Sequence, residues 1–194
     1  MTRTRRVKAG FTFHPATADR WPDLEALFGE RGACGGCWCM AWRLPRAGYE
    51  AGKSGANRKA LRRLTRDRVP PGILAYRGAE AVGWCAVAPR EAYDYLDRSR
   101  VLRPIDDEAV WSVSCLFVAK PYRRQGLSVE LLRAAVRFAR RHGAGIVEGY
   151  PVIPGSDAMP AVFAWTGTYS AFVAAGFGEA GRHSEKRPIM RASP

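Results

Sequence analysis

The sequence predicts a mixed α/β fold, and three observations support this. An apolar run rich in Val, Trp and Phe at residues 110–118 is typical of a buried strand. A short glycine turn and a long amphipathic helical pattern at residues 126–142 follow it directly. Two further apolar runs are separated by a four-residue turn, as in a hairpin. The 194 residues, 47% of them hydrophobic, are enough to bury one core, so we expect one domain over residues 1–194.

The N-terminal third is expected to hold a strand and two helices. Trp21, Leu24 and Phe28 recur at helical spacing, whereas the glycines of residues 32–36 interrupt any regular pattern. Residues 1–8 are basic, and we expect them to be frayed. The elements expected here are a strand at 11–13, a helix at 17–28, a mobile loop at 46–55 and a helix at 57–67.

The remaining two thirds alternate between strands and helices. Pro and Gly punctuate the pattern, and Gly143 is a typical helix stop. Residues 90–107 and 151–160 show no regular period and are expected to be irregular. The elements expected here are strands at 73–76, 81–87, 110–118, 146–150 and 187–190, and helices at 126–142 and 168–175.

The chain is strongly basic, with a formal net charge of +13 and a pI near 10.1. Such a field attracts nucleic acid, acidic protein or the phosphates of a nucleotide cofactor, and charge alone does not choose among them. Six basic residues lie in the helix expected at 57–67 or just after it. No aromatic residues are interspersed among them, and no recognised nucleic-acid-binding motif is present in the sequence. We therefore interpret them as a solvated helix face and do not expect nucleic acid as a partner. They are Arg58, Lys59, Arg62, Arg63, Arg66 and Arg68.

Five cysteines, an odd number, occur without a secretory signal, so reduced thiols are favoured over a disulfide framework. No run approaches the roughly 20 apolar residues that span a bilayer. We expect a soluble, cytoplasmic protein. The spacing Cys34-x-x-Cys37-x-Cys39 invites a zinc interpretation, but no fourth ligand follows, so we expect no metal and treat these thiols as small hydrophobic groups.

The turn after the strand at 110–118 has the composition of an anion-binding site. A helix that begins here leaves backbone N–H groups without intrahelical partners and directs the positive end of its dipole at the turn. Gly126 permits close approach of a pyrophosphate, Ser128 is small, and Arg123 and Arg124 add positive charge. Short glycine turns before helices are common, so this spacing is weak support when taken alone.

Together, residues 110–177 resemble the GNAT acetyltransferase superfamily. The cofactor motif Q/R-x-x-G-x-G/A is filled here by Arg123, Gly126 and Ser128, where serine replaces the usual Gly or Ala. The resemblance implies a single domain with a mixed, mostly antiparallel sheet flanked by helices, and acetyl-CoA as the donor. It implies that the backbone of Leu116, Phe117 and Val118 pairs with the pantetheine arm. The pyrophosphate is then expected at the amides of Arg124, Gln125, Gly126, Leu127 and Ser128.

In the mechanism that the resemblance implies, a neutral amine attacks the thioester directly in a ternary complex. A general base, an oxyanion donor and a thiolate-protonating acid are then needed. Where the family often has a carboxylate base, this chain has Ser112. Glu148, inside the strand expected at 146–150, is our candidate base. The alternatives are an outward-facing side chain or a structural ion pair with an arginine, and Asp107 and Glu108 are lesser candidates.

The family's usual thiolate-protonating tyrosine is replaced by Phe172, which cannot donate a proton. Tyr169, three residues earlier and near the same helical face, is the candidate substitute, with Tyr150 or water as alternatives.

The acceptor is expected to be a small-molecule or peptide amine, bound near the sulfur-rich and aromatic segment after residue 36. Its aromatic side chains hint at an apolar or cationic acceptor. The candidate acceptor-binding residues are Trp38, Met40, Trp42, Arg43 and Tyr150. Two other hypotheses stay open: a catalytically weak or inactive module that binds CoA or nucleic acid in a regulatory role, and a zinc-dependent module. A homodimer is compatible with the sequence.

Overall fold

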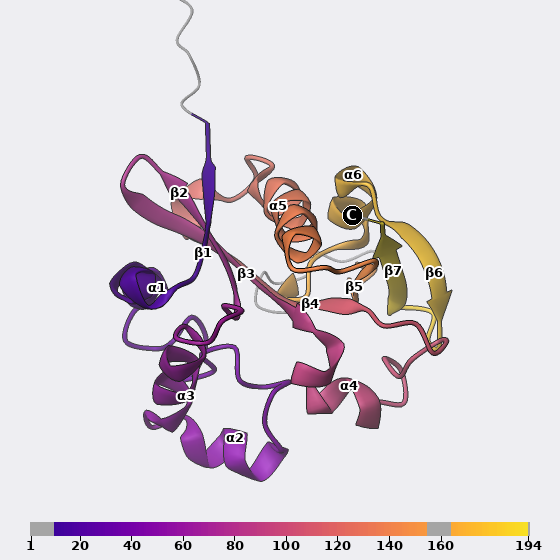
Figure 1. Ribbon diagram of the computed structural model, residues 1–194, viewed down its shortest axis with the longest axis horizontal. Helices are drawn as coiled ribbons and strands as arrows, with labels where there is room; N and C mark the ends of the chain where they lie inside the picture. Colours follow the sequence, from indigo (N-terminus) through magenta and orange to yellow (C-terminus); the bar gives the residue numbers. More distant parts are fainter. Residues whose placement is uncertain (1–9, 155–163, 194) are drawn as a thin grey trace, which may run out of the picture.

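The computed structural model describes residues 10–154 and 164–193 (Figure 1). Within these residues seven strands form one sheet in the order β1-β2-β3-β4-β5-β7-β6. Every neighbouring pair is antiparallel except β4 and β5, which run parallel. The predicted mixed, mostly antiparallel sheet is confirmed. The strands are β1 (Thr12–Pro15), β2 (Gly72–Arg77), β3 (Glu80–Pro89), β4 (Trp111–Val118), β5 (Val147–Gly149), β6 (Gly178–Arg182) and β7 (Pro188–Ala192).

Helices cover both faces of this sheet, as predicted. The short 3-10 turns are η1 (Ala18–Arg20), η2 (Arg90–Ala92) and η3 (Lys120–Tyr122). The α-helices are α1 (Trp21–Phe28), α2 (Arg46–Gly52), α3 (Ala56–Leu64), α4 (Asp94–Arg98), α5 (Leu127–Arg141) and α6 (Tyr169–Ala175).

The core has two sides because side chains alternate across the sheet. Ile73 and Ala75 of β2 face α5 and pack in one cluster with Phe138. Leu74 of β2 faces the other way and packs with Trp84 and with α1 and α3. Figure 1 shows α5 and the group α1–α3 on opposite sides of β3 and β4. The period-two pattern of the strands thus fixes which helix covers which face.

Three segments differ from the sequence prediction. Residues 90–107, expected to be irregular because they show no regular period, contain η2 and the short helix α4. Residues 46–55, expected to be a loop because of their glycines, contain α2. Gly52 is needed for packing, since a Cβ there would lie 2.2 Å from Oδ1 of the buried Asn57 on α3. Strand β6 was not predicted, because its sequence Gly-Glu-Ala-Gly-Arg has no apolar alternation and the strand is paired only along one side, to β7. Residues 1–8 and part of the expected loop 151–160 lie outside the described residues.

Strands β4 and β5 separate after three residue pairs, and this separation positions the site. They are paired at Trp111–Val147, Ser112–Glu148 and Val113–Gly149, after which β4 continues to Val118. The fully buried ring of Phe172 packs on Gly149, the last residue of β5, where a Cβ would lie 2.1 Å from a carbon of that ring. One edge of the second half of β4 is therefore free of β5.

Candidate functional site

A groove runs between the end of β4, the start of α5 and the start of α6. It consists of two hollows of about 300 and 340 Å³, within the range typical of small-ligand sites, which begins at about 300 Å³. The two hollows share four lining residues, so they form one continuous depression. The shared residues are Val118, Arg123, Ser128 and Ala171.

The glycine turn forms one end of this groove. Gly126 has φ 81° and ψ 0°, a left-handed conformation that glycine adopts without strain, and the space above it is open. Its carbonyl accepts from Val129 N at 3.0 Å, which starts α5. None of the amides of residues 124–128 donates to a backbone or side-chain acceptor in the described part of the chain. With the helix dipole behind them, these amides form a cradle suited to an anion.

Two side chains of the motif brace the turn itself. Arg123 Nε donates to the carbonyl of Val118 at 3.0 Å, and Gln125 Nε2 donates to the carbonyl of Pro121 at 2.8 Å. Arg124, at φ 59°, is exposed. The turn is therefore held by its side chains while its backbone donors stay open, and Arg123 and Arg124 both line the hollow at the turn.

The predicted pantetheine-binding residues Leu116, Phe117 and Val118 all line the groove. The Leu116 amide points away from β3, toward Trp165, and Val118, two residues further along the strand, presents its backbone on the same side. The amide of Leu116 donates to the carbonyl of Trp165 at 2.6 Å. An added strand at Leu116 thus requires the segment containing Trp165 to move away.

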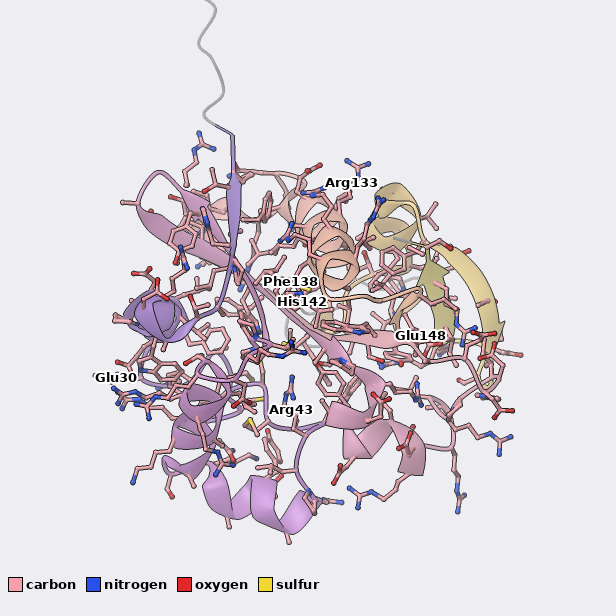
Figure 2. All side chains as sticks on the ribbon, in the orientation of Figure 1. Glu30, Arg43, Arg133, Phe138, His142 and Glu148 are labelled. Atoms are coloured by element: carbon pink, nitrogen blue, oxygen red, sulfur yellow. The ribbon has the colours of Figure 1, made fainter. Side chains whose placement is uncertain are left out.

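Glu148 lies at the centre of a buried network, with 1% of its surface exposed. Its Oε1 accepts from Arg90 Nη1 at 2.9 Å and from the Tyr150 hydroxyl at 2.6 Å, and its Oε2 accepts from Arg191 Nε at 2.8 Å. Arg90 also donates to the carbonyl of Leu102 at 2.9 Å. Two guanidinium groups stabilise the ionised carboxylate and occupy both of its oxygens. This is the structural ion pair that the sequence left open as the alternative to a base; Figure 2 places Glu148 near the C-terminal strands.

Tyr150 and Ser112 complete the network. The Tyr150 hydroxyl lies 2.8 Å from Ser112 Oγ and accepts from Arg90 Nη1 at 2.7 Å. Burial, reinforced by the negative charge of Glu148, holds the pKa of Tyr150 well above its usual value. Tyr150 therefore stays neutral and acts as a donor to Glu148. Ser112, at the position where the family often has a carboxylate, serves as a hydrogen-bonding partner of Tyr150.

The two aromatic residues on α6 point to the core. Phe172 is fully buried between Gly149 and Gly167. Tyr169 begins α6 and packs, partly buried, against the core cluster that contains α5. The α6 side of the groove is made by Thr168, Ser170 and Ala171. Tyr169 is not among the residues that line the two hollows.

The candidate acceptor residues divide into two groups. Trp38 stacks on Trp21, with ring centres 5.7 Å apart, and packs with Met40 in the core under α1. Trp42 instead contacts the edge of Trp165, a groove residue, with ring centres 5.1 Å apart. The structure thus links Trp42, and not Trp38, to the groove.

Around Trp42 lies a further set of aromatic rings. Tyr95 stacks on Trp42 at 5.6 Å with an interplanar angle of 12°, and Tyr150 meets it edge-on at 5.6 Å. Arg43 lies 4.5 Å above the ring of Tyr93, and Figure 2 shows it near the middle of the molecule. Trp42, Arg43 and Tyr150 are thereby brought together on one side of the sheet.

Sequence reasoning missed Arg90, Arg191 and Trp165. The only local signal for Arg90 was its place directly after a strong strand, and Arg191 lies on a short C-terminal strand. Trp165 fell between two expected elements. Each of these residues makes its contacts with residues that are distant in the sequence, and local sequence patterns do not reveal such contacts.

The structure also bears on the cysteine cluster as a metal site and on the presence of a membrane-spanning helix. Cys34 is exposed at the groove, while Cys39 is buried and contacts Cys115. Across residues 10–154 and 164–193, no three His, Cys, Asp or Glu side chains gather in a way that could hold a metal ion. No helix in those residues is long and apolar enough to cross a membrane.

Comparison with known proteins agrees with this architecture. The sequence profile of the acetyltransferase (GNAT) family matches residues 38–153. No curated protein sequence matches the chain. The similar solved structures described next are 12% to 16% identical to this chain, so they support the fold alone.

Three solved structures share the fold over nearly the whole chain. A GNAT-family acetyltransferase from Listeria monocytogenes has a TM-score of 0.58 at 12% identity, covering 97% of this chain and 99% of that one. A mosquito (Aedes aegypti) protein named as an arylalkylamine N-acetyltransferase has 0.57 at 16%, covering 94% and 87%. The PaiA N-acetyltransferase from Thermoplasma acidophilum, solved with coenzyme A, has 0.54 at 12%, covering 95% and 99%. Because the family profile spans more than half of the 194 residues, the chain belongs to the GNAT acetyltransferase family.

Proposed function

We propose that this protein is an N-acetyltransferase that transfers the acetyl group of acetyl-CoA to an amine by direct attack in a ternary complex. The observation that carries the proposal is the cradle of open amides at residues 124–128, at one end of a groove that reaches the free edge of β4. The coenzyme A in the Thermoplasma acidophilum structure and the family membership support the same donor.

The groove fits the parts of acetyl-CoA in order. The pyrophosphate would lie on the amides of residues 124–128, where Gly126 leaves space and Arg124 adds charge. The pantetheine arm would run along Leu116 and Val118 as an added strand, displacing the carbonyl of Trp165 from the Leu116 amide. The thioester would then reach the point where β4 and β5 separate.

In the reaction the amine nitrogen forms a bond to the thioester carbon, the carbon–sulfur bond breaks, and the amine loses one proton while the thiolate gains one. We assign the stabilisation of the developing oxyanion to a backbone donor of β4. Glu148 already accepts from two guanidinium groups and Tyr150, which favours a positioning role for it over that of a base. We therefore propose that water carries the proton from the amine, and that Tyr169 is not the acid.

The acceptor is proposed to bind beside Trp165 and Trp42. These rings meet where the groove leaves the cofactor cradle, so a flat apolar part of an amine could pack against them. The mosquito protein is named for arylalkylamines, which carry an aryl group and an amine, and this name agrees with the proposed acceptor. Within this proposal the protein works as one cytoplasmic domain on a small-molecule or peptide amine.

A second candidate function is a regulatory module that binds CoA without efficient turnover. It is favoured by Ser112 and Phe172, which stand where the family often has a base and an acid.

Release of free CoA from acetyl-CoA, followed across a panel of arylalkylamines, polyamines and peptides, tests the proposal. We expect release that depends on the amine, together with a product heavier by one acetyl group. Calorimetric titration with CoA supplies the second readout. Binding without release on any amine would favour the regulatory module, and the absence of binding would overturn both.

A further inference from the structure

Two thiols from distant parts of the chain touch beside the groove. Cys39 Sγ and Cys115 Sγ lie 3.4 Å apart although 76 positions separate them in the sequence. A disulfide needs the two sulfur atoms at about 2.0 Å, so a shift of little more than one ångström would join them. Within the described residues this is the cysteine pair whose sulfur atoms are in contact.

The surroundings give the two thiols different access. Cys115 is half-buried on β4, whereas Cys39 is 8% exposed and accepts a hydrogen bond from Trp84 Nε1 at 3.1 Å. The adjacent Cys115 sulfur and burial hold the pKa of the Cys39 thiol well above its usual value. An oxidant in solution would therefore meet Cys115 first, with Cys39 held in place behind it.

The backbone around Cys39 is also constrained. Trp38 has φ 45° and Cys39 has φ 52°, in the left-handed region that side chains other than glycine seldom adopt. Packing of Trp38 under α1 holds this conformation. The position of the Cys39 sulfur is thus set by the fold and not by a freely moving loop.

We propose that Cys39 and Cys115 form a site of reversible oxidation by peroxide, which ties the N-terminal segment to strand β4. Hydrogen peroxide would oxidise the Cys115 thiolate to a sulfenic acid, releasing hydroxide. Cys39 then loses its thiol proton and attacks that sulfur; the sulfur–oxygen bond breaks, and the departing hydroxide takes the proton to form water. Two thiols are oxidised, one peroxide is reduced to two waters, and a dithiol in solution reverses the step.

The cross-link would connect two walls of the groove. Cys115 directly precedes Leu116, and Cys39 belongs to the same segment as Cys34; Leu116 and Cys34 both line the groove. Closing a long loop also constrains the unfolded chain, so the oxidised protein should melt at a higher temperature than the reduced protein. This inference stands apart from acetyl transfer and can be tested whether or not the protein turns over an amine.

The test is peptide mapping of the folded full chain after brief treatment with hydrogen peroxide and alkylation of the remaining thiols. Cleavage after basic residues leaves Cys34, Cys37 and Cys39 on one peptide, so the variant Cys34→Ser/Cys37→Ser makes the assignment unambiguous. We expect a cross-link between Cys39 and Cys115 in most molecules of both proteins, lost on addition of dithiothreitol. Recovery of Cys115 as a free thiol or sulfinic acid without the cross-link would overturn the proposal.

A second variant separates the two steps. In Cys39→Ser, Cys115 is still half-buried but has no thiol partner, so its sulfenic acid should persist and be captured by dimedone. Circular dichroism before treatment checks that this variant is folded. If wild-type Cys115 were captured by dimedone to the same extent as in Cys39→Ser, Cys39 would not be the resolving thiol.

Discussion

The glycine turn before α5 and the network around Glu148 lie on neighbouring parts of the sheet but are built in opposite ways. The turn presents backbone amides from consecutive residues, 124–128, and leaves them open. The network is made of side chains from separate segments, and each charge in it is paired. Its members are Arg90, Asp106, Ser112, Glu148, Tyr150 and Arg191.

This difference indicates that the turn binds a ligand and that the network supports the fold around it. Open donors at a helix start contribute little to stability and are available to a ligand. A carboxylate that is 1% exposed and paired with two arginines is costly to disturb, which suits it to a supporting role. The turn is thus suited to hold the cofactor, and the network to hold the strands that shape the groove.

The largest expected effect on stability comes from Glu148→Gln. Removing the carboxylate leaves Arg90 buried without its charged partner, and breaking such a pair costs about 3–5 kcal/mol. Denaturant unfolding measures this loss, and CoA affinity should be unchanged if the variant is folded at low temperature. Glu130→Gln, which removes an exposed pair with Arg133, is the matched control and should cost no more than about 1 kcal/mol.

A role of Glu148 as general base predicts different effects of Glu148→Gln on stability and turnover. If Glu148 were the general base, Glu148→Gln would keep its stability while turnover fell and the pH dependence of the rate disappeared. That outcome would show that Glu148 takes part in catalysis and does not only support the fold.

Gly126→Glu is expected to weaken CoA binding at least 100-fold, or about 2.7 kcal/mol, because a carboxylate would occupy the cradle. Gly143→Glu is the matched control: both glycines have a positive φ, 81° and 86°, and open space for a side chain, but Gly143 lies at the far end of α5. Calorimetry compares the affinities, and thermal melting should show a similar backbone strain in both. Equal CoA affinity in the two variants would contradict the assignment of the cradle.

Gly149→Ala tests the contact between the end of β5 and the Phe172 ring of α6. The new Cβ would overlap the buried ring of Phe172, and such overpacking costs about 1–3 kcal/mol. Gly178→Ala, on β6 with open space, is the control and should be nearly neutral. Denaturant unfolding of both variants measures the difference; a neutral Gly149→Ala would mean that Phe172 does not pack tightly on Gly149.

The smallest effect concerns pH. Because the pKa of Tyr150 is raised in the folded protein, the unfolded chain loses that proton first as pH rises. The stability that this shift contributes is complete below pH 10, the usual tyrosine value, and is lost progressively above it. Unfolding free energies from pH 8 to 11 should fall more steeply for the wild type than for Tyr150→Phe. Parallel curves would show that Tyr150 is not held in the network as described.

The same contrast explains how far the sequence could predict the structure. Strand β4, the turn and α5 were predictable because a strong apolar strand, Gly126 and a helical period are local signals. The Glu148 network was not, because Arg90 and Arg191 lie 58 and 43 positions from Glu148 and meet it only through sheet pairing. Helix α2 was missed because its glycines suggested a loop, whereas Gly52 serves packing against Asn57; β6 was missed because it lacks alternation.

Amide hydrogen exchange with and without CoA tests the division of roles most directly. We predict that CoA slows exchange at the amides of residues 124–128 and at the free edge of β4, while Glu148 and Tyr150 exchange slowly with or without it. CoA binding that leaves residues 124–128 unprotected, or that protects only the residues around Glu148, would contradict the assignment of the turn as the cofactor site.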